Sequence, residues 1–140
     1  ATTSLDVTVQ AQYLMLLKEL QSQSDFSIIF ITHDLGIVAQ MCNRVCVMYA
    51  GKIIESASVE DLFDHPAHPY TYSLIASVPA ADKEVDRLFS IDGQPPALHQ
   101  LPPGCAFKAR CSQQNHKCKD EFPPEVEVGP DHKVRCWQAI

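Results

Sequence analysis

The first 79 residues alternate between helical and strand-like patterns of apolar positions. Apolar residues recur at helical spacing between about residues 7 and 21, and Asp6 stands where a helix N-cap is expected. Residues 26–32 form a continuous apolar run rich in β-branched side chains, which is typical of a strand buried on both faces of a parallel sheet. A second helical pattern follows Asp34, whose carboxylate would lie at the positive end of that helix. This alternation predicts an α/β fold.

Shorter elements follow as far as Val78. Residues 44–49 and 52–55 have the composition of two strands joined by a tight turn. Ser58 begins a Ser-x-x-acid capping pattern that predicts a short helix, and Pro69 suits the first position of a helix that ends near Ser77. Because two or three strands make too small a sheet, we expect the strands that begin such a fold to be missing from this chain.

A change of composition divides the chain into three parts. Residues 1–79 form the α/β part, the polar and charged residues 80–87 predict a linker, and residues 88–140 form a tail. The tail holds most of the prolines and four of the six cysteines, but few large apolar side chains. A region of this size with so small a core usually needs a covalent or metal staple.

Charge and targeting signals exclude several classes of function. The 17 acidic and 11 basic residues leave a formal net charge of −6, which argues against a nucleic-acid binder and against a polybasic membrane surface. No apolar run approaches the roughly 20 residues that span a bilayer. The first residues also lack the basic and apolar regions of a secretion signal, so a disulfide framework is not favoured.

The six cysteines separate into two groups. Cys42 lies on a helical apolar stripe and Cys46 in a strand, so both are interpreted as small buried apolar residues. The other four follow the pattern Cys-x5-Cys-x6-Cys-x17-Cys: Cys105, Cys111, Cys118 and Cys136. Four thiolates suit a tetrahedral zinc ion or a four-iron cluster, and the lack of Cys-x2-Cys pairs favours iron–sulfur, with free or oxidised thiols as the remaining alternative. His65 and His68, which stand beside prolines, are interpreted as turn residues rather than ligands.

Several motifs resemble those of known transport ATPases. Residues 2–10, 28–36 and 47–55 resemble the ATP-binding subunits of bacterial ABC transporters. HPAHPYT at 65–71, and GQPP with LPPGCAFKARC at 93–111, resemble the C-terminal extension of the oligopeptide/dipeptide importer ATPases. The resemblance implies the incomplete C-terminal part of a P-loop NTPase (ABC ATPase) domain, followed by a small Cys/Pro-rich extension.

The resemblance also implies roles for three residues. Ser4-Leu5-Asp6 matches the D-loop, so Ser4 and Asp6 would face the nucleotide site of a partner subunit. His33 matches the switch histidine, which contacts the γ-phosphate of ATP and helps to hold the attacking water. The phosphate loop is absent from this chain, and we expect the Mg²⁺ ligand and the catalytic glutamate to be absent too. The full-length protein is therefore expected to hydrolyse ATP with Mg²⁺, whereas this chain alone is not.

Cofactors and partners follow from the same resemblance. Some dipeptide importer ATPases carry a [4Fe–4S] cluster on cysteines of this extension, which favours a cluster over zinc. The implied function is to power peptide import, together with a second ATP-binding subunit and membrane permease subunits, at the cytoplasmic face of the membrane and without nucleic acid. The alternatives are an ATPase subunit of a nickel or other small-solute importer, a free-standing iron–sulfur or redox-sensing module, and an interaction or dimerisation domain.

Overall fold

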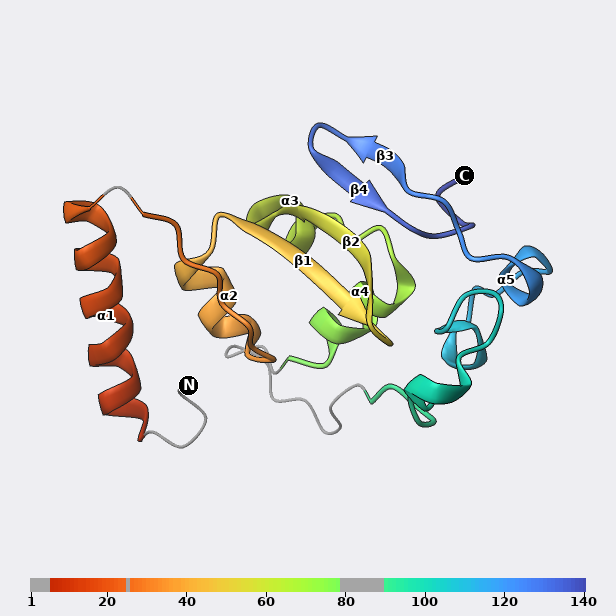
Figure 1. Cartoon of the computed structure of the whole chain (residues 1–140), viewed down its shortest axis with the longest axis horizontal. Coiled ribbons are helices and arrows are strands. Elements are labelled where there is room, and N and C mark those ends of the chain that lie inside the picture. The colour runs from red at the N-terminus through yellow and green to blue at the C-terminus, as the bar shows by residue number, and fades with distance from the viewer. Residues whose placement is uncertain (1–5, 25, 79–89) are drawn as a thin grey trace. The chain divides into compact units, whose positions relative to one another are not determined.

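The computed structural model describes residues 6–24, 26–78 and 90–140, which fall into two compact units (Figure 1). Unit 1 is Ala1–Cys42 and unit 2 is Asn43–Ile140. No helix in the described ranges is both long enough and apolar enough to cross a membrane.

Unit 1 contains two helices with side-chain caps. Helix α1 spans Val7–Gln23, and the Asp6 carboxylate accepts a hydrogen bond from the Thr8 N–H at 2.9 Å. Helix α2 spans Leu35–Met41, and Asp34 Oδ1 accepts from the first-turn amides at 2.8 and 3.2 Å. Both predicted caps are confirmed, because each depends only on residues two or three positions away.

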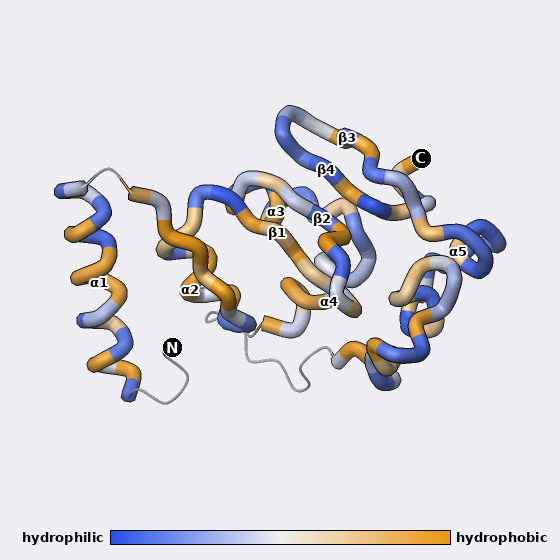
Figure 2. The backbone as a smooth tube through the Cα atoms, in the orientation of Figure 1, coloured by the Kyte–Doolittle hydropathy of each residue, from blue (hydrophilic) through white to orange (hydrophobic). Residues whose placement is uncertain are grey.

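The predicted strand over residues 26–32 is wrong. The segment is strongly hydrophobic (Figure 2), yet it has no regular secondary structure, and Ile29 and Ile31 are 88% and 95% exposed. A strand needs a neighbour that takes up its backbone hydrogen bonds, and no strand in the described residues pairs with this run. The parallel sheet that we expected around it is therefore not formed by this chain's described residues.

Unit 2 is built on a four-stranded antiparallel sheet with the order β1-β2-β4-β3 (Figure 1). Its strands are β1 (Arg44–Tyr49), β2 (Lys52–Ser58), β3 (Val126–Gly129) and β4 (His132–Val134). The β1–β2 hairpin confirms the sequence prediction, although β2 continues three residues beyond Glu55. The β3–β4 hairpin was not predicted. It joins β2 through β4, with Glu55 opposite Val134.

Short helices lie between β2 and β3 along the chain. Helix α3 spans Val59–Asp64 and is capped by Ser58, and α4 spans Pro69–Ala76 with Pro69 in its first turn, as predicted. The tail adds η1 (Leu98–Gln100), η2 (Lys108–Arg110) and α5 (Lys117–Asp120). The predicted linker, residues 80–87, lies outside the described residues, so the three-part division of the chain stays a prediction.

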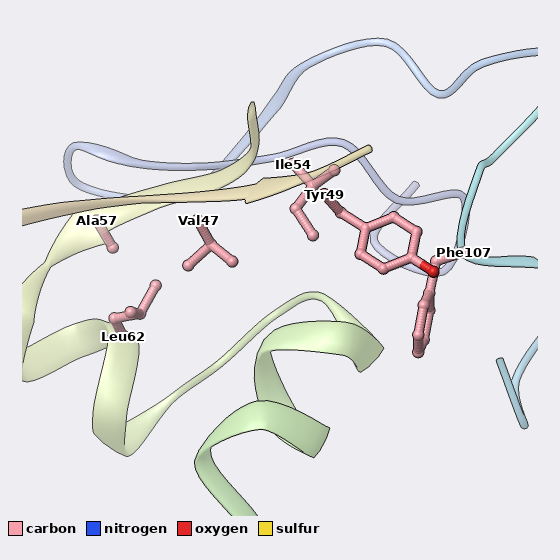
Figure 3. Packing of buried hydrophobic residues seen from close by; sticks show 6 residues of the cluster. All are labelled: Val47, Tyr49, Ile54, Ala57, Leu62 and Phe107. Atoms are coloured by element: carbon pink, nitrogen blue, oxygen red, sulfur yellow. The ribbon is translucent and has the colours of Figure 1, made fainter. Parts of the chain in front are cut away.

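The core of unit 2 combines side chains from both sides of that linker (Figure 3). Its fully or nearly fully buried members come from β1, β2, α3 and the tail: Val47, Tyr49, Ile54, Ala57, Leu62 and Phe107. The Phe107 ring packs edge-on against Tyr49 and Tyr70, with 5.3 Å between ring centroids in each pair. Phe107 therefore anchors the cysteine-bearing tail to the β1–β2 hairpin.

Candidate functional site

His33 lies in a turn that is fixed by its neighbours on both sides. The Asp34 N–H donates to Thr32 Oγ1 at 3.0 Å, while the Asp34 carboxylate caps α2. The His33 side chain itself is exposed. An exposed imidazole on such a turn can present a nitrogen to a phosphate oxygen or to a water molecule, which is the chemistry that the family resemblance implies for this residue.

Two other residues, Ser4 and Asp6, were predicted to face a nucleotide. Asp6 is exposed, and its carboxylate is engaged in capping α1. Ser4 lies outside the described residues. No hydrogen bond joins Asp6 to the turn of His33 in the described part of unit 1. The roles of all three residues stay predictions.

The four cysteines of the tail gather in one region of unit 2. Cys105 and Cys111 flank η2, Cys118 lies in α5, and Cys136 follows β4. The Cys105 N–H donates to the Cys118 carbonyl at 3.0 Å. Burial raises the pKa of the Cys136 thiol, a hydrogen bond from the Gln138 backbone lowers it, and the other three cysteines raise it further. Residues far apart in sequence are thus neighbours in space.

Backbone amides point at several of these sulfurs. Burial is the main reason for the raised pKa of the Cys105 thiol, and a hydrogen bond from the Phe107 backbone counteracts it. The same pattern holds at Cys111, where burial raises the pKa and the Gln113 backbone lowers it. The Gln138 N–H lies 3.5 Å from Cys136 Sγ. These amides offset only part of the effect of burial, and the pKa of each of the three thiols is raised overall.

The cysteine cluster consists of Cys105, Cys111, Cys118 and Cys136. Its four soft sulfur donors have the chemistry that iron–sulfur clusters and zinc require. All four are free thiols, and no group of three or more His, Cys, Asp or Glu side chains in the described ranges is arranged to hold a single metal ion. The donor chemistry fits, and metal binding by these residues stays a prediction.

The interpretation of Cys46 as a buried residue is wrong. Cys46 is exposed, whereas Val47 and Tyr49 are buried. Successive residues of a strand face opposite sides, so once Val47 takes the core side of β1, Cys46 faces away from it. Cys42 is half-buried beside the end of α2.

A buried polar centre at Glu55 was not predicted from the sequence. This residue is 1% exposed, and its carboxylate accepts from the Ala67 and His68 amides at 2.7 and 3.0 Å. His132 Nε2 from β4 lies 2.8 Å from Glu55 Oε1. A carboxylate directly after the apolar pair Ile53-Ile54, followed by a His-Pro loop, was the available signal.

His68 belongs to the same polar centre. It is the N-cap of α4, and its Nδ1 accepts from the Tyr70 N–H at 3.0 Å. Burial lowers the pKa of His68 to about 4, and the nearby Glu55 carboxylate opposes this. A neutral imidazole is required, because only an unprotonated Nδ1 can accept that hydrogen bond. His68 thus acts as a helix cap within the loop where a turn was predicted.

Comparison with known proteins identifies what the chain is similar to. Residues 54–118 match the family described as oligopeptide/dipeptide transporter, C-terminal region. The dipeptide transport ATP-binding protein DppD of Bacillus subtilis is 50% identical over 136 residues, which cover 97% of this chain and 41% of that protein. DppD of Lactococcus lactis is 49% identical over 97% of this chain and 39% of its own length. The oligopeptide transport ATP-binding protein AppD of B. subtilis is 46% identical over 97% of this chain and 42% of its own length.

This chain spans about two fifths of the length of these relatives. The agreement in sequence nevertheless extends over nearly all of its own residues. Over nearly all of its length, the chain therefore matches the C-terminal region of oligopeptide and dipeptide ABC transporter ATP-binding proteins.

Proposed function

We propose that the chain belongs to an ATP-hydrolysing subunit that powers peptide import through an ABC transporter. The observation that carries the proposal is its similarity to peptide-transport ATP-binding proteins over 97% of its length. The turn with an exposed His33 is consistent with it. ATP and Mg²⁺ would supply the phosphoryl group and the charge neutralisation, and this chain's residues would position them.

His33 has the central role in this proposal. Thr32 and Asp34 fix the backbone on either side of it, so its imidazole can hold the terminal phosphate and orient the attacking water without reorganisation. Ser4 and Asp6 would face the nucleotide held by a second ATP-binding subunit. Because the Asp6 carboxylate also caps α1, its contribution would include fixing the start of that helix.

A chimera tests the catalytic role. The matching C-terminal region of B. subtilis DppD is replaced by this chain, and ATP turnover is measured with the permease subunits present. We expect turnover in the chimera and a loss of at least about a hundredfold in His33→Ala. The matched control is His99→Ala, which removes another exposed histidine. A folded chimera without turnover, or a His33→Ala variant with full turnover, would contradict the proposal.

The proposed cargo is peptide, and the proposed partners are permease subunits and a second ATP-binding subunit at the cytoplasmic face of the membrane. The relatives' names support a peptide cargo. The alternative is a nickel or other small-solute importer. Deletion of the gene from its host should abolish uptake of labelled dipeptide and leave nickel uptake unchanged. The reverse result would favour the alternative.

We further propose that the cysteine cluster holds a [4Fe–4S] group. The support is the proximity of four thiols in a small, partly buried region, and the backbone amides directed at three of them. When bound, the group would supply redox chemistry and a covalent staple for the tail. Zinc at the same thiols, or a redox-sensing module built on them, is the competing interpretation.

Anaerobic reconstitution tests the cluster. We expect four iron and four sulfide per chain, by analogy with the four-thiolate ligand set, together with visible absorbance. Cys105→Ser should lose most of this signal, whereas Cys46→Ser is the matched control because Cys46 is exposed on β1. Zinc binding without sulfide would reject the cluster.

A further inference from the structure

A close backbone contact occurs where two segments of the cysteine cluster meet. Gly104 is buried, and a Cβ atom at this position would lie 2.7 Å from the carbonyl carbon of Lys119 and 2.8 Å from its carbonyl oxygen. It would lie even closer to the carbonyl oxygen of Cys118. All these atoms belong to the backbone, so a side chain at residue 104 could be accommodated only by moving one chain segment away from the other.

The same two carbonyl groups accept hydrogen bonds from the segment that Gly104 begins. The Cys105 N–H donates to the Cys118 carbonyl at 3.0 Å. Lys108 Nζ donates to the Lys119 carbonyl, also at 3.0 Å. The contact at Gly104 and these two bonds therefore act together, and they set the separation of Cys105 from Cys118.

Asn115 fixes the other side of the contact. Its side-chain oxygen accepts from the amides of Lys117 and Cys118 at 3.0 and 3.3 Å. Cys118 Sγ lies 3.5 Å from the same oxygen, within reach of a weak S–H hydrogen bond. Asn115 thus directs the start of α5 and the thiol it carries.

We propose that Gly104 and Asn115 are the positioning residues of the cysteine cluster. Gly104 permits the segment of Cys105 to approach that of Cys118, and Asn115 orients the Cys118 side chain. Neither residue is a ligand. The expected effect on iron and sulfide binding rests on the proposed function of the cluster. The approach of the Cys105 and Cys118 thiols can be measured without any metal.

The principal experiment compares Gly104→Ala with Gly129→Ala in the 140-residue chain. Gly129 is the matched control, because a Cβ there would lie at an ordinary 3.7 Å from its nearest neighbour, His132 Cβ. After anaerobic reconstitution, we expect Gly104→Ala to bind iron and sulfide about tenfold to a hundredfold more weakly than the unchanged chain. Gly129→Ala should match the unchanged chain, and fluorescence of Trp137 should report whether each variant is folded.

A second readout uses the metal-free chain. Diamide accepts two electrons and two protons from a pair of thiols and leaves a disulfide, and mass spectrometry identifies the cysteines joined. We expect the Cys105–Cys118 product in the unchanged chain and in Gly129→Ala, and the loss of most of it in Gly104→Ala. If the unchanged chain binds no iron or sulfide but this difference persists, the cluster proposal fails and the positioning inference stands.

Two results would overturn the inference. One is a folded Gly104→Ala variant with the iron binding and Cys105–Cys118 product of the unchanged chain. If Gly104→Ala does not fold, Asn115→Ala takes over the test, since it deletes side-chain hydrogen bonds and introduces no clash. The other is an Asn115→Ala variant with an unchanged yield of the Cys105–Cys118 product.

Discussion

The two compact units of the chain, Ala1–Cys42 and Asn43–Ile140, differ in how they use their apolar side chains. In unit 1 the described buried apolar residues are Leu14, Ile37 and Val38, while many others, such as Ile31 at 95%, are exposed. In unit 2 side chains from β1, β2, α3 and the tail form one core around Phe107. Unit 1 thus carries recognisable motifs but buries few of its described apolar side chains. Unit 2 has one core that joins the predicted β1–β2 hairpin to the tail.

This difference shows that motif strength and structural stabilisation are separate properties. The turn of His33 is held by side-chain hydrogen bonds within three residues. The polar centre of unit 2 instead joins Glu55 to a loop 12 residues away and to His132, 77 residues away. Substitutions at the buried polar centre of unit 2 should therefore have large effects, and substitutions at the helix caps of unit 1 should have small, local effects.

The largest expected effect is that of Glu55→Ala. It leaves one buried and one partly buried backbone N–H group, together with His132, without their acceptor, which should lower the free energy of unfolding by about 3–5 kcal/mol. Urea denaturation followed by Trp137 fluorescence measures it. Glu127→Ala, an exposed carboxylate of the same sheet, should change stability by less than about 0.5 kcal/mol. Equal effects of the two substitutions would show that the buried contacts of Glu55 do not stabilise unit 2 more than an exposed carboxylate does.

Acid should destabilise unit 2 through His68. Its pKa is lowered from the ordinary 6.5 to about 4 in the folded chain, so the unfolded chain takes up the proton first as pH falls. Its contribution is full above about pH 6.5 and is lost towards pH 4, with a maximum of about 3 kcal/mol. Denaturation curves across this range measure it. His68→Asn keeps a capping acceptor and should flatten the dependence, whereas an unchanged slope would assign it to other groups.

A smaller effect is expected for Asp34→Ala in unit 1. The substitution removes the acceptor of the Gly36 and Ile37 amides, which should destabilise α2 by about 1 kcal/mol. Hydrogen exchange at these two amides should become faster. Asp34→Asn retains an acceptor and serves as the control. A change in the exchange of β1 or β2 amides would show that the effect is not local.

A small effect is also expected for Glu125→Gln in unit 2. Glu125 lies 3.8 Å from Lys133 Nζ and 3.2 Å from the Arg135 guanidinium, but its side chain is 41% exposed. Exposed ion pairs contribute little, so we expect a loss of less than about 1 kcal/mol that shrinks further in high salt. Denaturation at two salt concentrations checks it. A loss comparable to that of Glu55→Ala would show that burial is not what separates these two carboxylates.

The candidate sites were predictable to different degrees. His33 and the four tail cysteines could be named from motif and spacing, but what they bind could not. Glu55 and His68 were missed as a polar centre, because their contacts connect β2 with α4 and β4. Gly104 showed no signal of its own, since the atoms that exclude a side chain there belong to residues 14 and 15 positions further along.

The sequence by itself determined the features that depend on neighbours along the chain. The helix caps at Asp6, Asp34 and Ser58, together with the β1–β2 hairpin, are of this kind. Only the tertiary structure decided that residues 26–32 form no strand and that β4 pairs with β2. It also brought the four thiols together. The physical reason is that caps and tight turns are satisfied within a few residues, whereas strand pairing and thiol clustering need partners that only the folded chain supplies.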